Sequence, residues 1–184
     1  MKRFLLLFLA TVVTAWSASA QLSVSQLRTE HLTDPVGIGE RRPLLSWEVS
    51  DASRRGVTQS AYEIRVKSGG RTVWRTGKVA SAESAGVFYD GTPLTSDTRY
   101  TWQVRVWDDR GKASAWSRPA FWRTGLFDVG EWQARWIEPA VSDDLAAMFR
   151  RTFRVTKPVA EATVYVTAHG IYEASVNGHR VSDD

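Results

Sequence analysis

The sequence predicts an all-β protein. It would consist of a fibronectin type III or immunoglobulin-like β-sandwich, followed by the truncated start of a second, jelly-roll-like β-sandwich. Two observations predict this class. Residues 22–125 contain short apolar segments separated by turn residues at intervals typical of a sandwich. Within them, residues 100–107 alternate strictly between two faces, as a strand with one buried face does.

The 184 residues divide into four predicted segments. These are a signal peptide (1–20), the fibronectin type III-like domain (21–125), a junction (126–144) and the truncated second sandwich (145–184). The signal peptide is predicted from Lys2 and Arg3, the apolar run 4–13 and the small residues Ala18 and Ala20 before the cleavage site. The run is shorter than the ~20 residues of a spanning helix. A secreted protein, periplasmic or extracellular and free of the membrane after cleavage, is therefore expected, with a membrane anchor as the less favoured alternative.

The first domain is predicted to have about seven strands, the number found in such sandwiches. The expected strands are 22–30, 45–49, 62–66, 71–76, 87–89, 98–107 and 121–124, and residues 34–39 are expected to form a loop. In the third strand Glu63, Arg65 and Lys67 should point outward, away from the core. Leu94 and Tyr100 have the arrangement of a tyrosine corner, in which the tyrosine hydroxyl reaches back to the upstream backbone.

The second domain is predicted from two alternating segments and one turn. Residues 149–155 and 162–168 alternate as strands, and Asn177-Gly178 is a strong signal for a type I′ hairpin that returns from His179. Three strands alone do not bury a core, so we expect this domain to continue beyond residue 184. Trp132 and Trp136 are expected to pack the junction against its neighbours.

Composition excludes several functional classes. The formal charge of +4 falls to about +2 without Lys2 and Arg3, and no basic run is longer than a pair. We therefore interpret the arginines as solvated strand edges rather than a nucleic-acid surface. The chain has no cysteine, so the first domain depends on its core alone.

No catalytic, cofactor-binding or metal-binding residue is assigned. The three histidines (His31, His169 and His179) lack metal-ligand spacing and are interpreted as polar turn residues. The aspartate pairs at 108–109, 143–144 and 183–184 are expected to be exposed turn residues without the raised pKa of a general acid. Tyr172 and His179 flank the predicted hairpin, but nothing marks them as sugar ligands, so substrate-binding residues stay unknown.

One aromatic cluster is more specific. Arg99, Arg105 and Trp107 share the outward face of the 98–107 strand, and Trp116 lies on the next segment. We expect Trp116 to stack on one of these guanidinium groups in a cation–π ladder. The alternative is that Trp116 is an exposed platform for a sugar.

Several motifs together resemble a known family. DPVGIGERRPLLSWEV, QSAYEIRV, VFYDGTPLTSDTRYTWQVRVWDDRGKASAWS and FWRTGLF resemble, in this order, the N-terminal part of bacterial α-L-rhamnosidases of glycoside hydrolase family 78. MFRRTFRV and AEATVYVTAHGIYEASVNGHRV resemble the β-sandwich domain that comes next in those enzymes.

The resemblance implies hydrolysis of terminal α-L-rhamnose from glycosides and polysaccharides with inversion. In the family, two carboxyl groups on a downstream (α/α)₆ barrel carry the reaction, and inversion requires them roughly 6.5–9.5 Å apart. The resemblance also implies that this chain is an N-terminal accessory region with no cofactor and no catalytic residue, and that it is inactive alone. The rhamnose-containing substrate would be bound by the barrel, which this chain lacks. The alternative is a non-catalytic carbohydrate-binding or adhesion protein of serial β-sandwiches.

Overall fold

The computed structural model describes residues 22–140 and 146–181 of the chain. Two compact units are present, residues 1–134 and residues 135–184. The predicted signal peptide and the aspartate pairs at 143–144 and 183–184 lie outside the described residues. Among the residues that the structure describes, no helix is long and apolar enough to span a bilayer.

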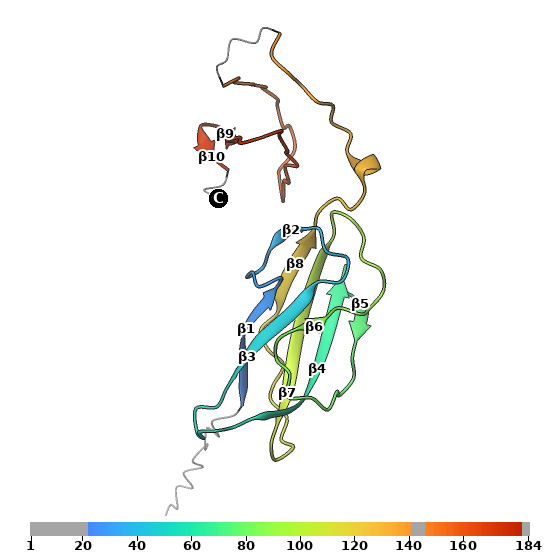
Figure 1. Ribbon diagram of the computed structural model, residues 1–184, viewed down its shortest axis with the longest axis vertical. Coiled ribbons are helices and arrows are strands. Elements are labelled where there is room, and N and C mark those ends of the chain that lie inside the picture. Colours follow the sequence, from blue (N-terminus) through green and yellow to red (C-terminus); the bar gives the residue numbers. More distant parts are fainter. Residues whose placement is uncertain (1–21, 141–145, 182–184) are drawn as a thin grey trace, which may run out of the picture. The chain divides into compact units, whose positions relative to one another are not determined.

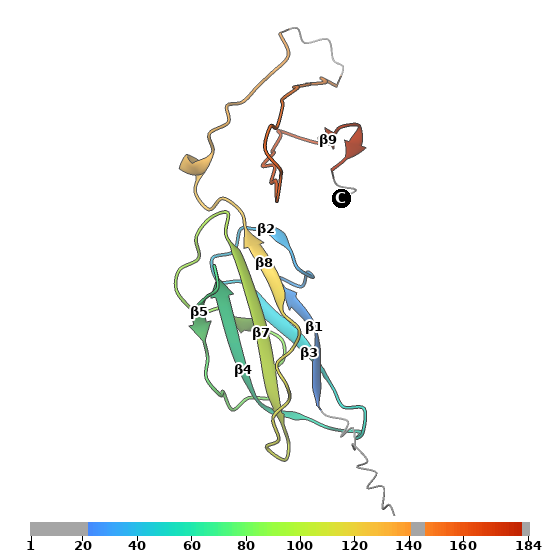
Figure 2. The same cartoon turned by 180° about the vertical axis from the view of Figure 1, so that it is seen from behind.

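Unit 1 is a β-sandwich of two sheets. One sheet has the order β1-β3-β6 and the other the order β2-β8-β7-β4-β5. The strands are β1 (Ser23–Thr29), β2 (Val36–Ile38), β3 (Leu44–Ser50), β4 (Gln59–Ser68), β5 (Arg71–Arg75), β6 (Val87–Phe88), β7 (Arg99–Asp108) and β8 (Ala120–Thr124). The three-stranded sheet lies in front in Figure 1, and the five-stranded sheet lies in front in Figure 2. This arrangement confirms the predicted immunoglobulin-like sandwich.

One strand was not expected. Residues 34–39 are predicted as a loop, but Val36–Ile38 forms β2, which pairs in parallel with β8. The Arg123 amide donates to the Pro35 carbonyl (2.9 Å), and the Gly125 amide donates to the Ile38 carbonyl (2.8 Å). Gly37 has a φ of +85°, a conformation that glycine adopts without strain. A strand of three residues, flanked by proline and glycine, is too short to show the alternation of apolar and polar residues that predicts strands. This strand is therefore recognised only from its pairing with β8.

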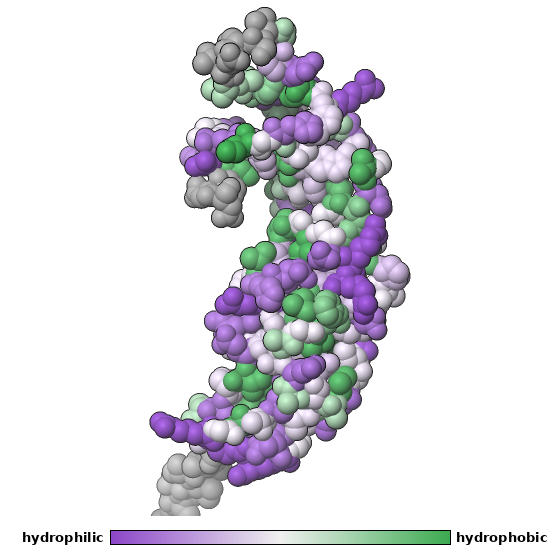
Figure 3. Space-filling model, viewed as in Figure 1, coloured by the Kyte–Doolittle hydropathy of each residue, from purple (hydrophilic) through white to green (hydrophobic). Residues whose placement is uncertain are grey.

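The core lies between the two sheets and consists mainly of large aromatic and branched side chains. Tyr100, Trp102, Val104 and Val106 alternate inward along β7, each at most 3% exposed, as predicted. The other core residues are Leu22, Leu27, Ile38, Leu45, Trp47, Tyr62, Ile64, Val66, Val87, Tyr89, Leu94 and Trp122. The outer side of the three-stranded sheet is largely hydrophilic, with hydrophobic residues in small separate areas (Figure 3).

The predicted tyrosine corner is present at the start of β7. The Thr95 amide donates a hydrogen bond of 2.8 Å to Oη of Tyr100. The Tyr100 ring stacks on Trp122 with a centroid separation of 5.4 Å, and Leu94 is buried beside this region of the core. The corner therefore joins the connection before β7 to the centre of the five-stranded sheet.

The chain leaves unit 1 through a short 3₁₀ helix, η1 (Val129–Glu131). The structure ends β8 at Thr124, and the division between the two units falls after residue 134. The boundaries predicted at 125 and 144 stay predictions.

Unit 2 contains one hairpin, β9 (Ser175–Val176) paired with β10 (His179–Arg180). Asn177 and Gly178 have φ of +52° and +80°, the positive values that a type I′ turn requires, which confirms this prediction. The strands predicted at 149–155 and 162–168 do not form. Their alternation is real, but a strand needs a hydrogen-bonded neighbour, and the described part of unit 2 supplies none for them. Phe149 and Phe153 accordingly remain 53% and 74% exposed.

The first prediction concerns the tyrosine corner. Tyr100→Phe should lower the free energy of unfolding by about 1 kcal/mol, because the part-buried hydrogen bond from the Thr95 amide to the Tyr100 hydroxyl is lost. Urea denaturation of the protein measures this. Tyr62→Phe is the matched control, since the Tyr62 hydroxyl has no hydrogen-bond partner within the described residues. Equal effects of the two substitutions would contradict the assigned role of the corner.

Candidate functional site

The outer face of the five-stranded sheet carries a group of charged, polar and aromatic side chains. Because β4 and β7 turn alternate residues into the core, the intervening side chains point away from it. Neighbouring β5 and β8 extend the same face through the pairs Arg65↔Arg75 and Arg99↔Arg123. The face is formed by Glu63, Arg65, Lys67, Arg75, Arg99, Gln103, Arg105, Trp107, Phe121 and Arg123.

Glu63 lies near the middle of this face and is buried. It points outward, as predicted, yet the residue is only 2% exposed. Nε of Arg75 donates to Oε1 of Glu63 (2.6 Å), and Nε of Arg105 donates to Oε2 (2.7 Å). The two arginine side chains cover the carboxylate that they neutralise. A buried carboxylate held by two guanidinium groups is a stable structural pair rather than a proton donor.

The electrostatic balance at Glu63 supports this interpretation. Burial is the largest single influence and raises the pKa of Glu63, but the hydrogen bonds and charges of Arg75 and Arg105 together outweigh it. The pKa of Glu63 is therefore lowered below its ordinary value of 4.5. A general acid needs the opposite shift.

Trp116 lies between two arginines of this face. Its ring centroid is 4.2 Å from Cζ of Arg65 and 5.0 Å from Cζ of Arg105. The predicted cation–π ladder is thus present with Arg105, while Arg99 stacks instead on Phe121 at 3.7 Å. Because Trp116 is half-buried under guanidinium groups, the ladder is favoured over an exposed sugar platform.

The sequence did not indicate Arg65 as a partner of this ladder. Arg65 lies on β4 and reaches the β7 side only through the register Arg65↔Gln103, in which Nη2 of Arg65 donates to Oε1 of Gln103 (2.8 Å). Residues 38 positions apart in the chain share no local pattern. The alternation of residues in β4 was the one feature of the sequence that pointed to Arg65, because it places this side chain on the outward face of the sheet.

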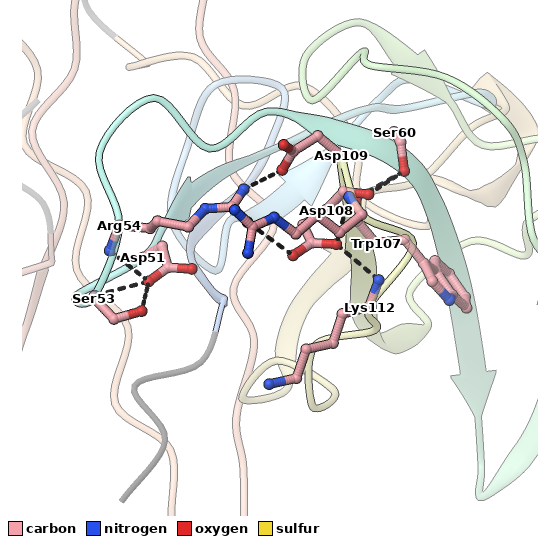
Figure 4. A network of polar contacts seen from close by, with 9 residues as sticks. Asp51, Ser53, Arg54, Ser60, Trp107, Asp108, Asp109 and Lys112 are labelled. Atoms are coloured by element: carbon pink, nitrogen blue, oxygen red, sulfur yellow. Dashed lines mark hydrogen bonds and ion pairs between the residues drawn. The ribbon is translucent and has the colours of Figure 1, made fainter.

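A second polar cluster joins the β3–β4 loop to the turn after β7 (Figure 4). The expectation that Asp108 is exposed is wrong, because it is only 6% exposed. The amides of Arg110 (3.0 Å) and Lys112 (2.7 Å) donate to its Oδ1, so the turn folds over the carboxylate. Arg54 points at both acids of the pair, with Nη1 at 3.9 Å from Oδ2 of Asp108 and Nη2 bound to Asp109. Asp109 is exposed, as expected.

The histidines do not form a metal site in the described residues. His31 is exposed in a turn, His169 stacks on Trp136 with centroids 4.1 Å apart, and His179 begins β10. Residues 22–140 and 146–181 contain no group of three histidine, cysteine or carboxylate side chains placed to hold a metal ion. The contact with His169 places Trp136 within unit 2, where it packs the start of this unit.

Two shallow hollows lie on the surface of unit 1. One, of about 240 Å³, is lined by Arg41, Arg42, Tyr89, Asp90 and their neighbours, and the other, of about 280 Å³, lies beside Trp116. The first contains a single carboxylate, Asp90, which pairs with Arg42 at 3.1 Å. The second contains none. Neither hollow therefore brings together the two carboxyl groups that glycoside hydrolysis uses.

These features define a β-sandwich module with a cationic, arginine-covered outer face. The family model "Rha78A-like, N-terminal immunoglobulin domain" matches residues 24–128, more than half of the chain. The chain therefore belongs to this family. A second model, "Alpha-L-rhamnosidase N-terminal domain", matches residues 157–184.

Relatives and solved structures agree with the family. The chain is 37% identical to an α-L-rhamnosidase of Streptomyces avermitilis, over 88% of this chain and 18% of the relative. The crystal structure of a Streptomyces avermitilis α-L-rhamnosidase complexed with L-rhamnose superposes with a TM-score of 0.62 and 43% identity, over 65% of this chain and 12% of that one. The α-L-rhamnosidase from Dictyoglumus thermophilum superposes with a TM-score of 0.60 and 33% identity, over 63% and 14%. The chain spans less than a fifth of the length of the two named bacterial enzymes.

The second prediction concerns Glu63. Glu63→Gln should lower the free energy of unfolding at neutral pH by about 1–3 kcal/mol, because Arg75 and Arg105 lose the charge that they share. The lowered pKa means that the ionised carboxylate stabilises the fold fully above its unfolded pKa and loses this effect as pH falls through the lower folded pKa. The difference between wild type and variant should therefore shrink on acidification below about pH 4.5.

Urea denaturation at a series of pH values measures this difference. Glu48→Gln is the control, because Glu48 is an exposed residue of β3 in the other sheet. A difference between wild type and Glu63→Gln that stayed constant down to pH 3 or so would contradict the ion-pair assignment.

Proposed function

We propose that this chain is the N-terminal accessory region of a secreted α-L-rhamnosidase that hydrolyses terminal α-L-rhamnose from glycosides with inversion of configuration. The observation that carries the proposal is the ordered match of two rhamnosidase family models, at residues 24–128 and 157–184. The similarity to the Streptomyces avermitilis enzyme, which spans both regions, supports it.

In this proposal the catalytic carboxyl groups belong to the rest of the full-length enzyme. An inverting glycosidase protonates the leaving oxygen with one carboxylic acid, while a second carboxylate activates a water on the opposite face of the sugar. The described residues present no such pair, and the carboxylates buried among them, Glu63 and Asp108, are held by hydrogen bonds to arginine or to turn amides.

The role proposed for unit 1 is to support and orient the downstream part of the enzyme. Oε2 of Glu131 accepts hydrogen bonds from Oγ of Ser96 (2.7 Å) and from the amides of Phe127 (2.9 Å) and Asp128 (3.0 Å). Arg41 pairs with Asp128 at 3.1 Å and lies over the Phe127 ring at 4.6 Å. These contacts hold residues 127–131 against the rest of unit 1 and so fix the direction in which the chain leaves β8.

The third prediction concerns the activity of the full-length gene product. It should hydrolyse p-nitrophenyl α-L-rhamnopyranoside, and proton NMR should detect β-L-rhamnose as the first product, because inversion reverses the anomeric configuration. The 184-residue chain alone should release no rhamnose. First release of α-L-rhamnose would refute inversion. Failure of the full-length protein to cleave any rhamnoside of a panel would favour a non-catalytic sandwich protein instead.

The fourth prediction concerns export. Expression of the chain in a Gram-negative host should yield periplasmic protein whose N-terminus is Gln21, because signal peptidase requires small residues at positions such as Ala18 and Ala20. N-terminal sequencing of the purified protein gives the result. Ala18→Arg should leave the precursor uncleaved. Cytoplasmic protein beginning at Met1 would contradict secretion.

A further inference from the structure

The fold gathers cations that are scattered in the sequence. Six of them, Arg65, Lys67, Arg75, Arg99, Arg105 and Arg123, occupy the outer face of the five-stranded sheet. The buried Glu63 pairs with Arg75 and Arg105, and the part-exposed Asp97 pairs with Arg123. The interpretation of the arginines as solvated strand edges is therefore wrong for this set, because strand pairing brings them onto one face.

The carboxylates of the protein balance only part of the positive charge on this face, because Arg75 and Arg105 pair with Glu63 and Arg123 pairs with Asp97. Arg65 lies directly opposite Arg75 across β4 and β5, and Arg99 lies opposite Arg123 across β7 and β8. Like charges at directly opposed positions destabilise a sheet. In the described part of the chain, no carboxylate lies within ion-pair distance of Arg65, Lys67 or Arg99. An anionic partner would relieve this repulsion.

The face is suited to binding an extended polyanion rather than a small molecule or the bases of a nucleic acid. The six cations are spread along four paired strands, β4, β5, β7 and β8, and none of them lines either of the two hollows described above. The rings of Phe121 and Trp116 are covered by guanidinium groups, which leaves them unavailable as stacking platforms for nucleic-acid bases. Arg65 is held in place by Trp116 and Gln103, which lowers the entropy lost when it binds a ligand.

We propose that this face, defined by the six cations, binds a carboxylate-bearing polysaccharide. A guanidinium group recognises a carboxylate through two parallel hydrogen bonds, and repeated carboxylates along a glycan match repeated cations along the strands. The choice of a glycan over other polyanions rests on the proposed function. The surface would hold an acidic glycan near a rhamnosidase, without taking part in the cleavage itself.

The test measures binding by the mature chain without any hydrolysis. Affinity electrophoresis in native gels containing polygalacturonate should retard the protein, gels containing neutral dextran should not, and the retardation should weaken as ionic strength rises. Lys67→Gln/Arg99→Gln should raise the dissociation constant roughly tenfold, because two cations without carboxylate partners are lost. Both side chains lie outside the core, so circular dichroism should be unchanged.

The matched control removes the same charge elsewhere. Arg28→Gln/Arg55→Gln changes exposed residues of β1 and of the β3–β4 loop and should leave the dissociation constant within about twofold. Equal loss of binding in both double variants, or no retardation by polygalacturonate, would overturn the proposal. Binding to oligothymidylate as tight as to polygalacturonate would overturn it in favour of general polyanion binding. Rhamnoside hydrolysis by the full-length protein is measured in a separate assay. A failure of the proposed glycan binding can therefore be distinguished from a failure of the proposed enzymatic function.

Discussion

The antiparallel pairing of β4 with β7 is the constraint on which the rest of unit 1 depends. The register runs from Gln59↔Asp108 to Ser68↔Tyr100, through the centre of the five-stranded sheet. Because side chains alternate across a strand, one register places Ile64 and Val104 in the core and Glu63 and Arg105 together on the outside. A shift by one residue would bury the charged side chains and expose the apolar ones. The core and the cationic face are therefore two consequences of the same pairing.

The burial of large aromatic side chains stabilises this arrangement even where their polar atoms have no hydrogen-bond partner. Nε1 of Trp102 and of Trp122 are buried without a hydrogen-bond partner in the described structure. Each such group costs about 1–3 kcal/mol. Burial of a tryptophan removes about 150–250 Å² from water, which contributes about 4–6 kcal/mol at 25 cal/mol per Å². Trp122 also packs edge-on against Tyr89 with centroids 5.9 Å apart. The apolar gain thus exceeds the polar cost, which explains why these positions tolerate tryptophan.

The features predicted correctly from sequence are those that depend on local patterns. The period of two in β7, the spacing of Leu94 and Tyr100, and the Asn177-Gly178 turn each lie within a few residues, and each predicts the observed structure. The stacking of Trp116 on Arg105 was also predicted, because the turn after β7 returns the chain beside the same strand.

The features that sequence reasoning missed depend on pairing between distant segments. β2 becomes a strand only beside β8, and Glu63 becomes buried only because Arg75 and Arg105 arrive from two neighbouring strands. The grouping of arginines on one face depends on the register of four strands. Conversely, residues 149–155 alternate between apolar and polar side chains but do not form a strand. Alternation predicts which side chains would share one face, but it does not supply the hydrogen-bonded neighbouring strand that a sheet requires.

Unit 1 is thus an arginine-faced sandwich that matches the family of Rha78A-like N-terminal immunoglobulin domains, and hydrogen bonds to arginine or to turn amides hold its buried acids Glu63 and Asp108. Hydrogen–deuterium exchange of the chain measures the stability of each strand separately and so shows whether the pairing of β4 with β7 holds unit 1 together. The paired amides of β4 and β7 should exchange only on global unfolding, while those of the edge strands β2 and β5 should exchange sooner. If β4 and β7 exchanged before β1 and β3, the pairing at the centre of this account would not be what holds the domain together.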